Sequence, residues 1–191
     1  MPATELDEPV RTALAEVAAF NRSRDDALAI PEEAGAFMHA LILASGATRG
    51  LELGTSYGYS GLWIASALHR NGGRLVTIER ESRKSEIAGR HFERAGLSEC
   101  IDRRIGAIAD ALSGLSGPFD FVFVDADKEA SLDYVRRFRP KLAARAVIVT
   151  DNILHPPHFN WPEYLAVLRN DANLFSTLVP VGNGMELTIV R

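Results

Sequence analysis

Cysteine is almost absent from this chain of 191 residues, in which Cys100 is the only one. An internal disulfide is therefore excluded, and we expect a reducing compartment. The acidic N-terminus lacks the apolar stretch that a signal peptide or a membrane span requires. Internal repeats, low-complexity tracts and linkers are also lacking, which indicates one domain over residues 1–191. These absences predict a soluble, cytoplasmic protein with no membrane partner.

An excess of positive charge is lacking too, because the formal net charge is −4. A protein with this balance has no overall field that attracts nucleic acid. One local basic run does occur, and it consists of Arg136, Arg137, Arg139, Lys141 and Arg145. Such a run is typical of a solvated helix face, although it is also the feature that would suit an RNA substrate.

What the chain does contain is an alternation of strand-like apolar runs with helical patterns, the signature of βαβ units and a mainly parallel sheet. We expect strands at 49–53, 74–79, 101–105, 119–124, 146–150, 174–181 and 185–190. We expect helices at 5–20, after Pro31, and at 59–68, 82–95, 130–139 and 162–169. Asn183-Gly184 between the last two strands is typical of a hairpin, so the sheet should end in an antiparallel pair.

The first strand runs into LELGTSYGYSG, which has glycines at 54, 58 and 61 before a helix begins. Glycine lets the backbone approach a ligand closely, and the helix N-terminus offers free N–H groups to an anion. The spacing is not G-x-G-x-x-G, which argues against a dinucleotide pyrophosphate. A smaller anion fits better, such as the carboxylate at the methionine end of a sulfonium cofactor, with Ser60 as an added donor. An ordinary strand-to-helix turn is the alternative.

Glu79 closes the second strand of the predicted sheet. An acid at that position commonly binds the two hydroxyls of an adenosine ribose. Nicotinamide and adenosyl cofactors would both satisfy it, and a solvent-facing carboxylate at a strand end is the alternative.

Oxygen ligands follow two later strands of the predicted sheet. Asp125 and Asp127 come after FDFVFV, and Asp151 and Asn152 come after AVIVT. The carboxyl ends of neighbouring parallel strands open into one crevice, so these side chains could converge on one hard divalent cation. Lys128 would lie beside it, which suggests deprotonation of a bound hydroxyl. His155 and His158 follow, and we interpret them as polar loop residues over the pocket mouth rather than metal ligands.

Together these segments resemble the class I S-adenosylmethionine-dependent O-methyltransferases of the catechol and caffeoyl-CoA O-methyltransferase group, bacterial O-methyltransferase family 3. The resemblance runs from about Ile30 to the C-terminus. LELGTSYGYS is similar to the family's first cofactor motif and VTIE to its second. FDFVFVDADK is similar to its metal and base motif, and VIVTDN to its second metal motif.

The resemblance implies a Rossmann-like α/β fold with helices on both faces of a seven-stranded, mainly parallel sheet. The implied strand order is 3-2-1-4-5-7-6 with the last strand antiparallel, and residues 1–46 would form an N-terminal helical cap. A homodimer is implied as well.

The resemblance also implies roles for single residues. S-adenosylmethionine would contact Ile30, Glu52, Gly54, Thr55, Ser60, Glu79, Ala107, Asp125 and Asp127. Asp125, Asp151 and Asn152 match the ligands of a divalent cation, magnesium foremost and manganese or calcium as alternatives. Lys128 matches the general base, which makes Lys128 and Asp125 the candidate catalytic residues.

The function that the resemblance implies is metal-dependent methyl transfer from S-adenosylmethionine to a hydroxyl of a small catechol-like or phenolic acceptor. The N-terminal region is shorter than in relatives that recognise a coenzyme A ester, and Pro156 stands where plant-type members carry a polar residue that contacts the substrate. Pro180 stands where the catechol enzymes carry an acid. Caffeoyl-CoA is therefore not the expected substrate. A tRNA wobble hydroxyuridine O-methyltransferase and a non-catalytic binder of adenosyl ligands are the alternatives. An NAD-linked oxidoreductase ranks below them because the glycine spacing is wrong.

Overall fold

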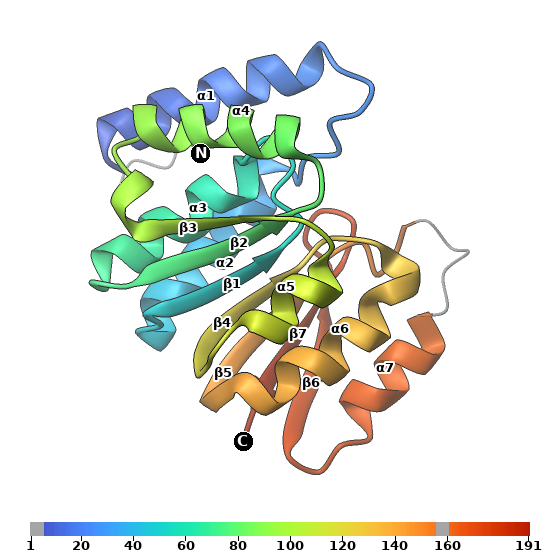
Figure 1. The fold of residues 1–191 in the computed structure, drawn as a ribbon. Helices are drawn as coiled ribbons and strands as arrows, with labels where there is room; N and C mark the ends of the chain where they lie inside the picture. Colours follow the sequence, from blue (N-terminus) through green and yellow to red (C-terminus); the bar gives the residue numbers. More distant parts are fainter. Residues whose placement is uncertain (1–5, 156–160) are drawn as a thin grey trace.

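One seven-stranded sheet organises the protein in a computed structural model that describes residues 6–155 and 161–191. The strand order is β3-β2-β1-β4-β5-β7-β6 (Figure 1). The strands are β1 (Arg49–Leu53), β2 (Arg74–Glu79), β3 (Ile101–Ile105), β4 (Phe119–Val124), β5 (Leu142–Thr150), β6 (Leu174–Val179) and β7 (Met185–Val190). β7 pairs antiparallel with β5 and with β6, and every other pairing is parallel. The predicted fold class and strand order are confirmed.

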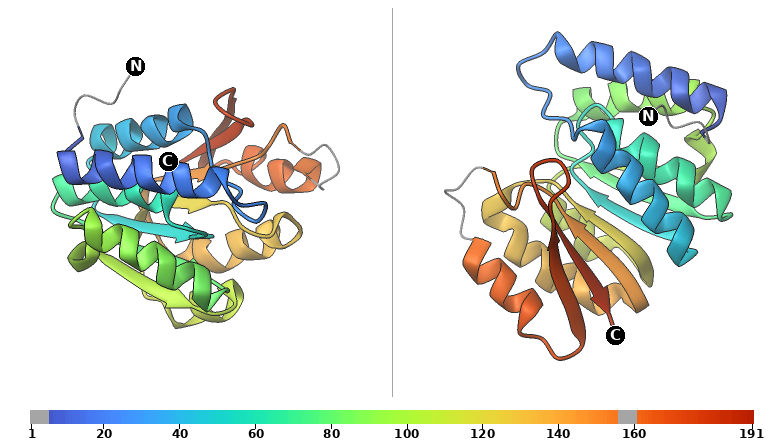
Figure 2. Two further views of the ribbon diagram at one scale, coloured as in Figure 1. Left: turned by 90° about the horizontal axis from the view of Figure 1, so that it is seen from above. Right: turned by 180° about the vertical axis from the view of Figure 1, so that it is seen from behind.

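Seven α-helices flank this sheet within the described part of the chain (Figures 1 and 2). They are α1 (Glu8–Arg22), α2 (Glu32–Ser45), α3 (Tyr59–Arg70), α4 (Ser82–Arg94), α5 (Ile108–Gly114), α6 (Ser131–Phe138) and α7 (Trp161–Arg169). None of the helices in this part combines the length and the apolar character of a membrane span. Sequence analysis missed α5, because seven residues make fewer than two turns and show no clear helical period.

Two hydrophobic cores lie on the two faces of the sheet, and the side chains of β4 divide between them. Phe121 and Phe123 belong to the core under α1 to α4, whereas Val122 and Val124 belong to the core under α5 to α7. This alternation follows from the two-residue period of a strand, and burial on both faces explains why β4 is apolar from Phe121 to Val124. Helix α1 packs on α3 and α4, on their outer side (Figure 2).

Local sequence fixes where the helices next to the cavity begin and end. Glu32 and Glu33 occupy the first turn of α2, where carboxylates favour the helix dipole, and α2 ends at Gly46 in a left-handed conformation. Gly58, with φ of 92°, precedes α3. Strand β5 starts at Leu142, four residues before the predicted 146, and its register with β4 shifts between Phe119 and Phe121.

Candidate active site

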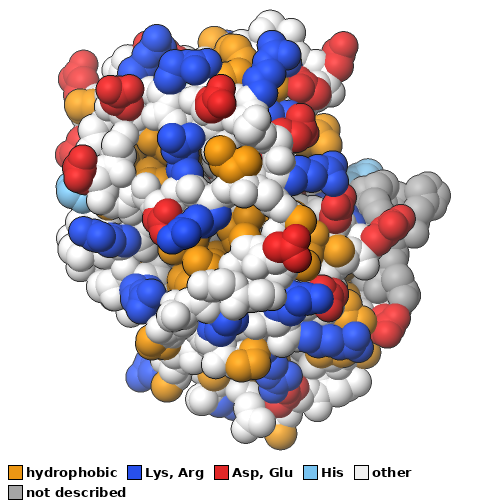
Figure 3. Space-filling model, viewed as in Figure 1, with side chains coloured by type: hydrophobic (Ala, Val, Ile, Leu, Met, Phe, Trp, Pro, Cys, Tyr) orange, Lys and Arg blue, Asp and Glu red, His pale blue; other side chains and the backbone are white. Residues whose placement is uncertain are grey.

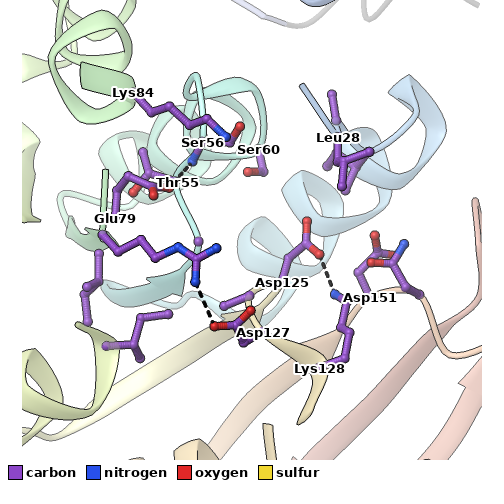
Figure 4. Close-up of a pocket in the computed structure, with 18 of the residues that line it drawn as sticks. Leu28, Thr55, Ser56, Ser60, Glu79, Lys84, Asp125, Asp127, Lys128 and Asp151 are labelled. Carbon is purple, nitrogen blue, oxygen red and sulfur yellow. Dashed lines mark hydrogen bonds and ion pairs between the residues drawn. The ribbon is translucent and has the colours of Figure 1, made fainter. Parts of the chain in front are cut away.

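A cavity of about 980 Å³ lies at the carboxyl ends of β1, β2, β4 and β5 (Figure 4). The sheet order reverses between β1 and β4, and open α/β sheets bind ligands at such a switch point. Eight of the nine predicted cofactor residues line this cavity: Ile30, Gly54, Thr55, Ser60, Glu79, Ala107, Asp125 and Asp127. The ninth, Glu52, lies behind its wall.

The glycine loop after β1 approaches the end of β4 very closely. Gly54 has a φ of +100°, and a Cβ atom at this position would lie 2.2 Å from the backbone oxygen of Asp125. The N–H groups of Gly54 and Thr55 both donate to the carbonyl of Ile78 on β2. Only glycine can adopt this conformation with the neighbouring strand so near. The loop is thereby held between the ends of β2 and β4.

Glu79 is held in a fixed orientation at the end of β2. One of its carboxylate oxygens accepts the N–H of Ser56 at 2.8 Å, and the other accepts the N–H of Glu81 at 3.0 Å. The residue is 8 % exposed and lines the cavity. Since a carboxylate oxygen has more than one acceptor position, Glu79 can still accept hydrogen bonds from a ligand.

Glu52 is completely buried beneath the glycine loop. The hydroxyl of Ser60 donates to one of its oxygens and the hydroxyl of Thr77 donates to the other, each at an oxygen–oxygen distance of 2.6 Å. Burial raises the pKa of Glu52 to about 7, against the lowering effect of these two hydrogen bonds. Glu52 therefore orients Ser60, which lines the cavity, from behind.

The predicted metal and base residues meet at the other end of the cavity. Lys128 Nζ donates to Asp125 Oδ1 over 2.7 Å (Figure 4), and the two side chains are 13 % and 19 % exposed. Asp151 and Asn152 line the same cavity. The N–H of Asp151 donates to the carbonyl of Val124, which extends the β4–β5 ladder to this residue. Asn152 has a φ of 65°, a conformation that asparagine tolerates.

Asp151 is the most unusual acid of the site. It is 2 % exposed, and its Oδ1 atom has no hydrogen-bond partner in the part of the chain that the structure describes. Burial, and then the nearby charge of Asp125, raise the pKa of Asp151 to about 6. A buried carboxylate oxygen without a partner costs free energy, so a positive ligand at this place would stabilise it.

Asp127 forms its ion pair outside this group. Asp127 pairs with Arg80 over 3.1 Å, with both side chains more than half exposed (Figure 4). His155 lines the cavity, whereas His158 is outside the described residues. Within those residues, no group of three or more His, Cys, Asp or Glu side chains is arranged to hold a metal. A cation at Asp125 and Asp151 would therefore depend on the amide of Asn152 as well.

Several lining residues were not predicted from the sequence. Asp26 and Leu28 come from the segment between α1 and α2, Lys84 from α4, and Asn183 from the loop between β6 and β7. Backbone hydrogen bonds from Ile153 to Gly184 and from Leu154 to Asn183 bring that loop to the cavity. These contacts join distant parts of the chain, so local sequence patterns do not predict them.

The fold and the cavity at its switch point define a Rossmann-like methyltransferase architecture. The sequence model described as O-methyltransferase matches residues 4–190, and the chain belongs to this family. It is 37 % identical over 150 residues to a catechol O-methyltransferase of Mycobacterium tuberculosis, an alignment that covers 78 % of this chain and 66 % of the relative. The chain thus spans just under two thirds of that relative.

Two further comparisons agree with this assignment. A catechol O-methyltransferase of Niastella koreensis is 36 % identical over 169 residues, which is 86 % of this chain and 76 % of the relative. The crystal structure of an O-methyltransferase from Bacillus cereus in complex with SAH superposes with a TM-score of 0.87. The two chains share 27 % sequence identity, and the superposition covers all of this chain and 94 % of the Bacillus cereus chain. The family and fold of this chain are those of S-adenosylmethionine-dependent O-methyltransferases.

Proposed function

We propose that the protein transfers the methyl group of S-adenosylmethionine to a hydroxyl of a small catechol-like or phenolic acceptor, with the help of a divalent cation. The observation that carries this proposal is the division of one cavity into two ends. The glycine loop and Glu79 form one end, and Asp125, Lys128 and Asp151 meet at the other. The relatives named catechol O-methyltransferase support the choice of acceptor class.

At the first end, the chain offers the groups that an adenosyl cofactor needs. The carboxylate of Glu79 would accept the ribose hydroxyls, and Ala107 would lie near the adenine. The N-terminus of α3, which begins at Tyr59, and the hydroxyl of Ser60 would face the anionic methionine end. The bound SAH of the Bacillus cereus relative supports this cofactor.

At the second end, the donor set fits a hard divalent cation. Two carboxylates and an amide supply oxygen ligands, and Asp151 Oδ1 is buried without a partner among the described residues. Asp125, Asp151 and Asn152 would hold the ion, with magnesium as our first choice. A cation held there would favour the ionised form of an acceptor hydroxyl and attract it to this end of the cavity.

Lys128 would be the base that takes up the proton of the acceptor hydroxyl. Its Nζ lies 2.7 Å from Asp125 Oδ1, which fixes the amine next to the carboxylates. The amine in its neutral form would take the proton from the acceptor hydroxyl, and Asp125 would stabilise the resulting ammonium. The acceptor oxygen would then attack the methyl carbon of the sulfonium, and S-adenosylhomocysteine would leave. Holding the two substrates in line would be the main contribution of the protein.

An RNA acceptor finds less support, because Lys141 of the basic run lies far from the metal end of the cavity. Lys141 precedes β5 and Asp151 follows it, so the nine residues of that strand, roughly 30 Å, separate them. Three of the five basic side chains already have partners within the protein. Arg137 pairs with Asp133, Arg139 pairs with Asp171, and Lys141 donates to the carbonyl of Leu115. Basic and acidic side chains are interspersed on the face shown in Figure 3.

Methyl transfer from labelled S-adenosylmethionine to a panel of catechols and phenols tests the proposal, with magnesium and with a chelator in parallel. We expect product that the chelator abolishes and that added magnesium restores. Product that resists the chelator would contradict the role of the cation. Transfer to undermodified tRNA alone would contradict the acceptor class, and cofactor binding without any transfer would favour the non-catalytic alternative.

A further inference from the structure

The segment between α1 and α2, residues 23–31, forms part of the cavity wall although it contains no regular helix or strand. We call it the α1–α2 linker. Asp26, Leu28, Ala29 and Ile30 of the linker line the cavity. The side chain of Leu28 is 85 % exposed, so packing does not hold it in place. In Figure 4, Leu28 lies on the side of the cavity where Asp151 lies, away from Glu79.

Asp26 anchors the α1–α2 linker to the rest of the protein. Its carboxylate accepts a hydrogen bond from the hydroxyl of Tyr57 over 2.7 Å and another from Arg24 Nε over 2.9 Å. Lys84 on α4 donates to the backbone oxygen of Asp26 over 3.2 Å. The hydrogen bonds from Arg24 and then from Tyr57 lower the pKa of Asp26 to about 2. Asp26 is thus ionised at neutral pH, and its contacts are charge-assisted.

Tyr57 belongs to the glycine loop, and its position there is tightly determined. It is 2 % exposed, its ring packs edge-on against Phe20 with 5.0 Å between centroids, and the guanidinium of Arg24 lies over it. His91 Nδ1 donates to the carbonyl oxygen of Tyr57 over 2.9 Å. Ser56, directly before it, donates its N–H to Glu79. Two adjacent residues of the loop therefore make these contacts, Ser56 with Glu79 at the cofactor end and Tyr57 with the α1–α2 linker.

We propose that Tyr57 and Asp26 are positioning residues, whose hydrogen bond couples the glycine loop to the α1–α2 linker and so fixes the wall beside the acceptor. This inference rests on the proposed function for the identity of the two substrates. A cofactor bound to the glycine loop would further stabilise Tyr57 in this position, and Tyr57 would hold the linker through Asp26. The acceptor would then meet a formed wall rather than a mobile segment.

The substitutions Tyr57→Phe and Asp26→Asn test this coupling with little change in volume. Tyr57→Phe keeps the ring against Phe20 and Arg24 and removes only the hydroxyl. The matched control is Glu16→Gln, which removes the 2.7 Å ion pair between Glu16 on α1 and Arg94 on α4 without touching the cavity. Amide hydrogen exchange of residues 23–31 is measured with and without S-adenosylhomocysteine, together with steady-state kinetics on a catechol.

In the unliganded protein we expect linker exchange roughly 10-fold faster in Tyr57→Phe and Asp26→Asn than in the wild type or Glu16→Gln. S-adenosylhomocysteine should slow linker exchange in the wild type and much less in the two variants. KM for the catechol should rise roughly 10-fold, while the Kd of S-adenosylhomocysteine changes less than about 3-fold. A destabilised fold would instead raise exchange in all elements alike.

Unchanged linker exchange in both variants would overturn the proposal, as would faster exchange with an unchanged KM. A wild-type protein that methylates no catechol would refute the proposed acceptor, and the exchange data would still decide on the coupling. In that case, protection of the linker by S-adenosylhomocysteine that disappears in Tyr57→Phe supports it, and protection that persists overturns it.

Discussion

The hydroxyl of Ser60 donates a hydrogen bond to the buried carboxylate of Glu52 over 2.6 Å. This contact joins the first turn of α3 to the interior of β1, directly under the glycine loop. While Glu52 is ionised, its carboxylate accepts this hydrogen bond and the Ser60 hydroxyl is occupied as a donor. When Glu52 is protonated, it can itself act as a donor, which leaves the Ser60 hydroxyl free for an anionic ligand. The protonation of Glu52 therefore bears on stability and on the cavity.

Stability should fall as pH rises through the range in which Glu52 titrates. The folded state holds the proton up to about pH 7, whereas the unfolded chain releases it near the ordinary value of 4.5. Between these values the folded state binds more protons, so its free energy of unfolding decreases with pH. The stabilisation by protonated Glu52 is fully present below pH 4.5 and is lost by the time the pH has risen above about 7. It amounts to about 3 kcal/mol of the free energy of unfolding.

Urea unfolding at pH 5, 6, 7 and 8 checks this expectation with the variant Glu52→Gln, which cannot titrate. The loss of stability between pH 5 and pH 8 should be smaller in Glu52→Gln than in the wild type. Glu99→Gln, which changes an exposed carboxylate, serves as the control and should follow the wild type. Parallel curves for the wild type and Glu52→Gln would show that the folded protein leaves the pKa of Glu52 at its ordinary value.

Asp151→Asn should abolish cation binding and increase the stability of the metal-free protein. The substitution replaces a buried carboxylate that has an unpartnered oxygen among the described residues with a neutral amide of equal size. At pH 8 without divalent metal, we expect the free energy of unfolding to rise by about 1–3 kcal/mol. We expect magnesium to raise the Tm of the wild type and to leave the Tm of Asp151→Asn unchanged. Asp102→Asn, at an exposed acid on β3, is the control, and a retained magnesium effect in Asp151→Asn would exclude Asp151 as a ligand.

Lys128→Met should act on turnover rather than on cofactor binding. The methionine keeps much of the side-chain volume but can neither take up a proton nor pair with Asp125. We expect kcat to fall at least about 100-fold, as is common when a general base is lost. The Kd of S-adenosylhomocysteine, measured by calorimetry, should stay within about 3-fold. An equal loss of binding and turnover would make Lys128 a binding residue, and Lys141→Met, at the far end of the sheet, is the control.

Gly54→Ala should be far more damaging than Gly72→Ala, although both glycines have positive φ values of +100° and +75°. A Cβ atom at Gly72 meets nothing within 4 Å, so the cost there is backbone strain of about 1–2 kcal/mol. At position 54 the Cβ atom also collides with Asp125, which adds roughly 1–3 kcal/mol. The free energy of unfolding in urea and the Kd of S-adenosylhomocysteine are measured for both variants. Similar losses of stability in Gly54→Ala and Gly72→Ala would mean that the loop relaxes away from β4.

The sequence predicted those parts of the fold that local patterns determine. The bounds of β1, β2, β3, β4 and β7 agree with the predictions. Turn residues or charges flank the apolar runs among them. The convergence of Asp125, Asp151 and Asn152 was predictable because parallel strands end at one edge of a sheet. Strand order came from the family resemblance, since pairing between distant strands leaves no local signal.

Other features depend on contacts that the sequence does not reveal. Asp26 and Tyr57 are 31 positions apart, and Asp26 and Lys84 are 58 apart, so no spacing rule brings them together. The early start of β5 depends on a register shift beside β4, and Arg145 has a φ of 63° there. Glu52 was predicted to hold the cofactor, but only tertiary packing shows that its carboxylate lies behind the cavity and supports Ser60.

The reversed direction of β7 has a consequence for how acceptor preference can evolve in this family. Because β7 runs against its neighbours, the loop that precedes it returns to the same edge as the ends of β1, β4 and β5. That loop carries Asn183 to the cavity, although it belongs to the last hairpin of the chain. Mutations, insertions or deletions in residues 180–184 can therefore reshape the acceptor end while the glycine loop and Glu79 stay unchanged.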